Sequence, residues 1–334
     1  MPPKTATPSE VNAVVIELTE DVIRAGFPGN LKPIAEKHIS PYWAKDIKSL
    51  RNRTSLLKAF TSLFYDKLLV SPRTHKVIVV EESLWSVEVK RTVAHLLLSE
   101  LHVAGLIFLP SAVCCAVGSQ RRDALVVSIG WFETTVVPVY DLRELQSTSG
   151  WTTGIVEDER RSEETDQESH GATRGLQLSD SSIPGKSKTL SEEELEQLKL
   201  SVHETTSTNL LSSRLERLIE DHDHPDDNER SIPLLINTVL SRLDLTCRQS
   251  CQSSIIITGP FGSIPHLSNK ILERVEKKWS NARLVATSGA WAGASVHSSF
   301  INWPTSGRIK GELTLDRYLG SEGKILFEWL FEGS

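Results

Sequence analysis

Residues 12–29 read NAVVIELTEDVIRAGFPG, two short apolar runs with a polar break between them. The break covers residues 17–21, and an apolar pair follows it before Arg24. A strand, a tight turn and a second strand produce this pattern, so the stretch predicts a β-hairpin. The two glycines of the closing GFPG supply turn residues that end the second strand.

Downstream of the hairpin, the spacing of apolar residues alternates between the helical and the strand period. Residues 53–69 and 85–101 place their apolar side chains on one face of a helix, and residues 77–80 read as a buried strand. Further strands are expected at 106–109, 125–129, 134–140 and 255–257. Further helices are expected at 233–245, 264–279 and 313–331. Residues 288–299 are rich in Gly and Ala, which permits close backbone packing. The alternation predicts an α/β fold on a mixed sheet.

A polar segment interrupts this pattern after Gly150. Residues 152–188 are rich in Ser, Thr, Glu and Asp and hold few large apolar residues. Such a segment cannot bury enough surface to offset its ordering entropy, so we expect it to be disordered. Helical signals return at Ser191 and Leu211, and the acidic run 220–229 is expected to be an exposed loop.

The bulk composition excludes several classes of protein. The chain has 334 residues and a formal net charge of −6, which argues against the basic surface that nucleic-acid binding needs. The longest apolar stretch, 103–117, is too short and too broken to span a bilayer, and residues 1–10 lack the apolar core of a signal peptide. We therefore expect a soluble intracellular protein with no nucleic-acid or membrane partner. The four cysteines are expected to be reduced, structural thiols and not metal ligands.

Five stretches, in order along the chain, resemble the actin family. They are VVIE (14–17) with RAGFPG (24–29), FYDKLLVSP (64–72) with 77–82, residues 125–130 with VVPVY (136–140), residues 255–259, and WAGAS (291–295). Ala-Gly-Phe-x-Gly is the most specific of these motifs. The resemblance covers most of the chain outside residues 142–230. It implies an actin-like, two-lobed α/β fold of duplicated ribonuclease H-like units with reduced small subdomains.

That resemblance implies four parts of the chain. They are a flexible N-terminus at 1–11, a first actin-like lobe with a truncated upper subdomain at 12–141, the polar and disordered insertion at 142–190, and a second actin-like lobe with the closing segment at 191–334.

In the actin family, ATP lies between two hairpin turns whose glycines let backbone N–H groups approach the phosphates. The first turn of the family reads Asp-Asn-Gly-Ser-Gly, and the matching residues here are Glu17, Leu18, Thr19, Glu20 and Asp21, with Arg24 on the following strand. Both glycines are absent, and two carboxylates stand where phosphate oxygens would lie. A like charge at ~4 Å costs roughly 1 kcal/mol in water and ~4 kcal/mol at a partly screened site, so tightly bound ATP is disfavoured.

The second turn of the family, Asp-Ser-Gly-Asp-Gly, matches Ser128, Ile129, Gly130, Trp131 and Phe132. A serine cannot replace the aspartate that organises the magnesium shell. The family's water-orienting glutamine matches Ser111, its histidine matches Thr135, and its Gly-Gly pair near the adenine matches Gly259 and Pro260. Acidic and bulky side chains are therefore expected to fill the cleft. We expect no catalytic residue, no metal and no cofactor, although nucleotide binding without turnover stays open as an alternative.

The resemblance also bears on assembly. Only residues 30–63 lie between the hairpin and the FYDKLLVSP motif, where actin builds a small lobe that grips the next subunit, and Tyr42 and Trp43 are the expected apolar anchors of what is left. Such a subunit can end a filament but cannot extend it. Within the family, the chain looks most like the divergent members at the pointed end of dynactin. This implies a cytoplasmic, cytoskeletal subunit that contacts dynactin's actin-related filament subunits and the other pointed-end subunits, in support of dynein. The alternatives are a nuclear actin-related subunit of a chromatin-remodelling complex and a nucleotide-binding actin-like ATPase.

Overall fold

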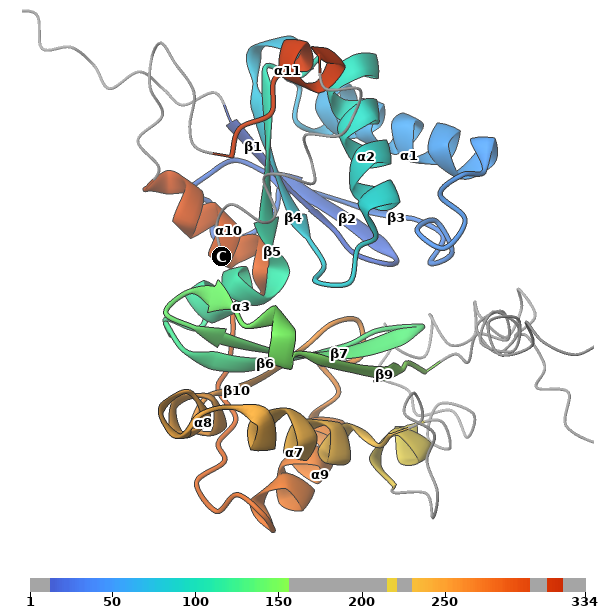
Figure 1. The fold of residues 1–334 in the computed structure, drawn as a ribbon. Coiled ribbons are helices and arrows are strands. Elements are labelled where there is room, and N and C mark those ends of the chain that lie inside the picture. Colours follow the sequence, from blue (N-terminus) through green and yellow to red (C-terminus); the bar gives the residue numbers. More distant parts are fainter. Residues whose placement is uncertain (1–12, 156–214, 221–229, 301–310, 321–334) are drawn as a thin grey trace, which may run out of the picture.

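The computed structural model describes residues 13–155, 215–220, 230–300 and 311–320. Within these ranges the chain forms two lobes, each built on one five-stranded mixed sheet (Figure 1). A pair of helices, α3 (Ser111–Gly118) and α10 (Ala290–Ser299), lies between the two sheets (Figure 1). The predicted mixed α/β fold of two lobes is therefore confirmed.

The first sheet holds the predicted hairpin. Its strands, in spatial order, are β3 (Ala35–His38), β2 (Val22–Gly26), β1 (Ala13–Leu18), β4 (Lys76–Glu81) and β5 (Gly105–Pro110). β1 pairs antiparallel with β2, in a register that sets Glu17 opposite Arg24, and it pairs parallel with β4. The first strand runs on through Leu18, so the turn is shorter than the polar break in the sequence.

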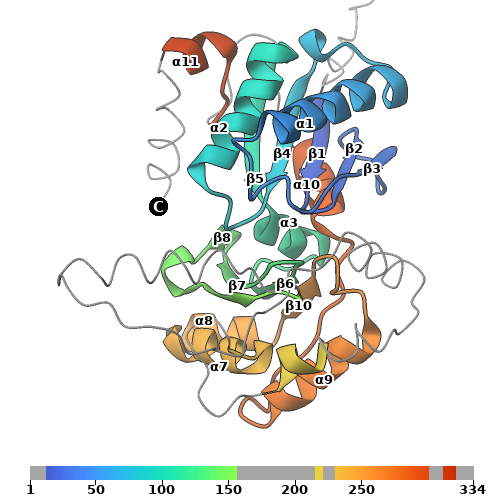
Figure 2. The same cartoon turned by 90° about the vertical axis from the view of Figure 1, so that its right-hand side faces the viewer.

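Two long helices cover the first sheet (Figure 2). α1 (Leu50–Ser62) continues into a π-helical turn at Leu63–Lys67, and α2 (Val87–His95) continues into another at Leu96–Glu100. A short 3-10 turn, Pro72–Thr74, leads into β4. The apolar stripes predicted for 53–69 and 85–101 face the sheet, with Phe60, Phe64 and Leu97 fully buried.

The second sheet is built from strands that lie far apart in the sequence. Its strands are β10 (Ile255–Thr258), β6 (Ala124–Ile129), β7 (Glu133–Tyr140), β8 (Arg143–Glu144) and β9 (Gly150–Thr153), with a 3-10 turn at Gln146–Thr148. β10 pairs parallel with β6, and β7 pairs antiparallel with β6, β8 and β9. The helices of this lobe are α7 (Ile232–Arg242), α8 (Leu245–Gln252) and α9 (Pro265–Glu276), on the face away from the first lobe (Figure 2).

The Gly- and Ala-rich segment packs closely, as predicted. A Cβ added at Gly293 of α10 would collide with the carbonyl oxygen of Cys114 in α3, so only glycine allows the two helices to lie this near. Trp291 of the same helix donates a hydrogen bond from Nε1 to the carbonyl oxygen of Val15, at 3.2 Å. This links α10 to the central strand of the first sheet.

The lobe boundaries differ from those implied by the resemblance. β6 and β7, placed in the first lobe at 12–141, belong to the second sheet, and residues 143–153 form ordered strands of that sheet instead of the start of a disordered insertion at 142. α10 and α11 (Leu315–Gly320), placed in the second lobe at 191–334, pack against the first. The first and last boundaries differ because the chain crosses between the lobes more than once. The strands after residue 142 were missed because a four-residue strand such as GWTT carries too short a pattern to be recognised.

Several other predictions can be compared with the structure. α7 ends at Arg242 and not at residue 245, because Asp244 caps a separate helix and accepts hydrogen bonds from the N–H groups of Thr246 and Cys247, each at 3.0 Å. The four cysteines are free and buried, as predicted. The predictions for residues 156–214, 221–229 and 321–331 lie outside the described residues. Among the helices of the described ranges, none is long and apolar enough to cross a bilayer.

Candidate functional site

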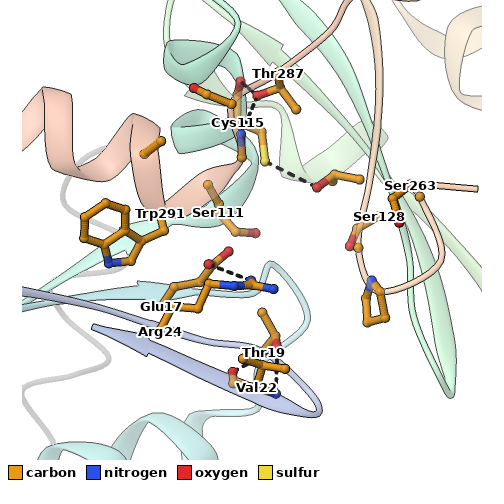
Figure 3. A pocket seen from close by; sticks show the side chains of 18 of the residues that line it. Glu17, Thr19, Val22, Arg24, Ser111, Cys115, Ser128, Ser263, Thr287 and Trp291 are labelled. Atoms are coloured by element: carbon orange, nitrogen blue, oxygen red, sulfur yellow. Dashed lines mark hydrogen bonds and ion pairs between the residues drawn. The ribbon is translucent and has the colours of Figure 1, made fainter. Parts of the chain in front are cut away.

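A cavity of about 960 Å³ lies between the two lobes (Figure 3). The β1–β2 turn borders it on one side, and the loop after β10 and the residues leading into α10 border it on the other. Of the fourteen residues predicted for a degenerate nucleotide cleft, the structure places nine in its wall: Glu17, Thr19, Asp21, Arg24, Ser111, Ser128, Trp131, Gly259 and Pro260. Leu18, Glu20, Gly130, Phe132 and Thr135 do not line it.

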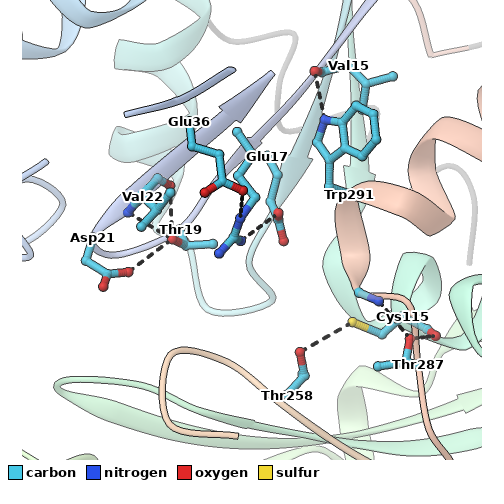
Figure 4. Close-up of polar contacts among 12 residues, drawn as sticks. Val15, Glu17, Thr19, Asp21, Val22, Glu36, Cys115, Thr258, Thr287 and Trp291 are labelled. Atoms are coloured by element: carbon cyan, nitrogen blue, oxygen red, sulfur yellow. Dashed lines mark hydrogen bonds and ion pairs between the residues drawn. The ribbon is translucent and has the colours of Figure 1, made fainter. Parts of the chain in front are cut away.

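The β1–β2 turn is closed by its own side chain. Val22 donates its backbone N–H to Thr19 Oγ1 at 3.1 Å, and Thr19 donates its N–H to the carbonyl oxygen of Val22 at 3.0 Å (Figure 4). Thr19 Oγ1 also lies 3.3 Å from Asp21 Oδ1. Two of the N–H groups of this turn are thus already bonded within it, so they are not offered to a ligand in the cavity.

A line of charges runs along the first-lobe wall. Arg24 donates to Glu17 Oε2 at 2.9 Å and contacts Glu36 Oε1 at 3.3 Å (Figure 4). Burial raises the pKa of Glu17 above its usual value, and the ion pair with Arg24 opposes that rise. The one arginine of this line is therefore occupied by two carboxylates, which leaves little positive potential for a phosphate.

Glu20 does not line the cavity, and its side chain contacts the second lobe. Its Oε2 accepts a hydrogen bond from the backbone N–H of Trp131 at 2.6 Å, a short distance that is typical of a charge-assisted bond. The contact needs a glycine at 130, since a Cβ there would lie 2.6 Å from the same oxygen. Burial raises the pKa of Glu20 to about 7; the N–H groups of Trp131 and Phe132 oppose that rise, and Glu133 and Asp21 add to it.

The aromatic rings of the second turn make the hydrophobic contacts that large rings favour and do not fill the cleft, although Trp131 borders the cavity. Trp131 is 1% exposed and packs edge-on against Phe261 in the core of the second lobe, with ring centroids 4.8 Å apart. Phe132 packs against Tyr42, also at 4.8 Å, with Lys45 Nζ 3.7 Å from its ring centroid. Large rings gain more from apolar burial than from exposure in a polar cleft, so both rotate into packed regions.

The other predicted positions carry no group able to act on water. Ser111 is the first residue of α3, and Thr135 lies in β7 opposite Ser128 and Trp151. Gly259, at φ +89°, packs its backbone on Ile129, where a Cβ would lie 2.6 Å from a carbonyl oxygen. Hydroxyl groups of ordinary basicity cannot serve as general bases near neutral pH.

Sequence reasoning missed several residues of the cavity wall. Glu82 directly follows β4 and Thr258 ends β10, so both lie at the carboxyl ends of parallel strands, where α/β folds place their ligands. Burial, and next to it Glu20, raises the pKa of Glu82 well above its usual range. Cys115 lies 3.9 Å from the hydroxyl of Thr258, and burial raises the pKa of its thiol to about 12, so it is not a nucleophile.

The residues present do not fit a magnesium nucleotide in the pose of the family. The volume is sufficient for a small ligand. However, Glu17, Asp21 and Glu82 face the space beside the turns, and a serine stands at the position of the metal-organising aspartate. No group of three His, Cys, Asp or Glu side chains that could hold a metal ion is found among the described residues. The wall thus holds more acidic than basic side chains, the basic ones being Arg24 and Lys32, and offers a polyphosphate little attraction.

The comparisons with known proteins agree with this architecture. Residues 49–149 match the family model described as Actin. The Actin-like protein ARP10 of Saccharomyces cerevisiae is 33% identical over 104 residues, which cover 31% of this chain and 37% of that protein. The match thus spans little more than a third of the relative's length, and the first turn lies outside the part that the family model covers. Over this part of its length the chain is therefore similar to the actin family and to ARP10, and the two mixed sheets with a cleft between them are consistent with an actin-like fold.

Proposed function

We propose that this chain is a non-catalytic, structural subunit that caps the pointed end of the actin-like filament of dynactin. In this role it would act in the cytoplasm, contact the actin-related filament subunits and the other pointed-end subunits, and support dynein-dependent transport. The observation that carries the proposal is the β1–β2 turn, where Thr19 and Asp21 stand at the two glycine positions of the family's phosphate-binding turn and Glu20 stands at its serine.

The chemistry of the cleft supports the proposed absence of catalysis. ATP hydrolysis needs a bound triphosphate, a metal to share its charge and a group that orients the water. The wall offers Ser111 and Ser128 at two of the corresponding positions, with acids beside them, and the third position holds Thr135, which does not line the cavity. The direct test is a Mg-ATP hydrolysis assay on the purified chain, in which turnover above that of a buffer control would contradict the proposal.

Capping is supported by the connection between β3 and α1. Residues 39–49 are all that separates these elements, and they fold back on the first lobe. Trp43 is buried, donates from Nε1 to the carbonyl oxygen of Thr19 at 3.0 Å, and packs edge-on against Trp85. In actin, by the resemblance, this segment grips the next subunit. A chain that lacks it presents one filament face without the complementary one, and growth stops there.

Affinity purification of the tagged chain from its native cells tests this assignment. Filament subunits and pointed-end subunits of dynactin should co-purify with it. Intact dynactin that lacks the chain would refute the proposal, and co-purification with a chromatin remodeller from nuclei would favour the nuclear alternative.

Nucleotide binding without turnover is a second candidate, favoured by the volume of the cleft alone. Its hydroxyl-rich wall, which includes Thr258, Ser263, Thr287 and Ser288, could receive an uncharged part of a ligand. Isothermal calorimetry separates this candidate from the purely structural role. Micromolar affinity for Mg-ATP would favour this candidate, and weak or absent binding favours the structural role.

A further inference from the structure

Glu20 joins elements of two different sheets. It belongs to the turn between β1 and β2 of the first lobe, and its partner Trp131 belongs to the turn between β6 and β7 of the second. The two turns meet in the 2.6 Å bond between Glu20 Oε2 and the Trp131 N–H, and the N–H of Phe132 also acts on this carboxyl.

The donor side of this bond, the turn that carries Trp131, is held in a fixed orientation. The ring of Trp131 is buried against Phe261. The N–H of Gly130 is bonded to the carbonyl oxygen of Glu133 at 3.0 Å, and the carbonyl oxygen of Phe132 accepts from Gly154 at 2.7 Å. The turn thus presents a preorganised N–H to Glu20, as a backbone nest does to an anionic oxygen.

The segment 39–49 strengthens the same junction from outside the cleft. Trp43 bonds to the backbone of Thr19 in the first turn, and its neighbour Tyr42 packs against Phe132 in the second. The Nζ of Lys45 lies 3.7 Å from the centroid of the same Phe132 ring. Three contacts of different kinds therefore converge on the two turns, and each is made between side chains or backbone of the chain itself.

We propose that the Glu20 carboxyl is a built-in substitute for a nucleotide phosphate, and that it links the two lobes so that the cleft keeps its closure without any nucleotide. This goes beyond the structural role proposed above, which requires only that hydrolysis be absent. It assigns to one side chain the bridging task that a ligand's phosphate performs between two N–H-bearing turns.

Inter-lobe distances and amide exchange test this link on the full chain. Spin labels at Ser55→Cys in α1 and Asn269→Cys in α9 lie on exposed positions of the two lobes, and the four native cysteines are buried. Double electron–electron resonance should give the same narrow distance distribution with and without Mg-ATP. In Glu20→Ala the distribution should broaden, and the Trp131 amide should exchange at least about tenfold faster, because its acceptor is lost.

Two variants make the test specific. Glu20→Gln keeps a carbonyl oxygen at the bridging position, so its distances and Trp131 exchange should stay close to those of the unmodified chain. Glu36→Ala removes a cleft carboxylate that contacts Arg24 within the first lobe only, so it should also leave both readouts unchanged.

Unchanged exchange and unchanged distances in Glu20→Ala would overturn the proposal, as would a shift of the unmodified chain on addition of Mg-ATP. If Glu20→Ala does not fold, Glu20→Asp carries the test, since it keeps the charge but shortens the side chain by one methylene, and it should show the same faster exchange. Failure to co-purify with dynactin would refute the proposed function and leave this result standing.

Discussion

Replacing Glu20 by Gln should stabilise the protein at alkaline pH and change its stability little at acidic pH. Burial raises the pKa of this carboxyl from 4.5 to about 7, so the folded protein holds the proton more tightly than the unfolded chain. Below about pH 4.5 both states are protonated, and the burial of Glu20 carries no ionisation cost. As the pH rises towards 7 the unfolded chain ionises first, stability is lost, and above the folded pKa the loss stays constant.

The size of the effect follows from the two pKa values. The difference between 4.5 and about 7 corresponds to about 3 kcal/mol above pH 7, and to less than about 1 kcal/mol at pH 5. The charged groups that act on this carboxyl are Glu133 on β7 and Asp21 on its own turn, and Glu20 in turn acts on Glu82 after β4. Because Glu20 and Glu82 repel each other, they titrate as a pair, and removal of one acid also relieves the other.

Urea unfolding followed by tryptophan fluorescence at pH 5 and pH 8 measures the effect. Gln is neutral but keeps a carbonyl oxygen for the Trp131 N–H, so Glu20→Gln should gain about 1–3 kcal/mol at pH 8 and less than about 1 kcal/mol at pH 5. The matched control is Glu276→Gln, an exposed position on α9, which should leave the pH dependence as it is. A Glu20→Gln protein with the pH profile of the unmodified chain, or one destabilised at pH 8, would refute the reasoning.

Three further substitutions test the packing around the cleft, each by urea unfolding. Trp131→Ala should cost about 3–5 kcal/mol, because it empties the space of a buried ring. Trp131→Phe should cost clearly less, because it keeps an aromatic ring and the buried Nε1 that it removes has no hydrogen-bond partner. Equal losses would contradict a packing role for the ring. Gly293→Ala should cost at least about 1–3 kcal/mol, because its Cβ would overlap a carbonyl of α3, whereas Gly320→Ala, with open space around it, should be tolerated. Lys76→Met should cost about 3 kcal/mol, because it removes the ion-pair partner of the buried Glu312 carboxylate, which lies 2.9 Å away. The double variant Lys76→Met, Glu312→Leu should lose less, and an equal or larger loss would argue against that cause.

Local patterns in the sequence predict the elements better than they predict the lobes. The hairpin at 12–29, the buried strand at 77–80 and the two long helices carry strong apolar periodicity, and each lies where its pattern indicates. The assignment of β6 to the second sheet depends on its pairing with Ile255–Thr258, more than a hundred residues further along the chain. No periodicity within a strand encodes such a distant partner, so the lobe boundaries could not be drawn from the sequence.

The same distinction applies to the cleft. Turn composition was sufficient to predict that the phosphate-binding backbone is altered, because glycine is required for close approach and acids repel an anion. The direction of each side chain depended on the other lobe. Trp131 turns into the core because Phe261 provides an apolar surface, and Glu82 enters the wall because β4 ends beside the first turn.

The two turns therefore cannot be interpreted separately. Considered alone, Glu20 is a charge that repels a phosphate. Considered beside Trp131, it is the anion that a backbone N–H receives, and its burial cost is offset in part by that hydrogen bond. A glycine at 130, which in the family admits a phosphate, here admits a carboxyl group instead. If Glu20 stands in for a phosphate as proposed, the second turn needs its glycine at 130 for this contact but not its second family glycine, whose position holds Phe132.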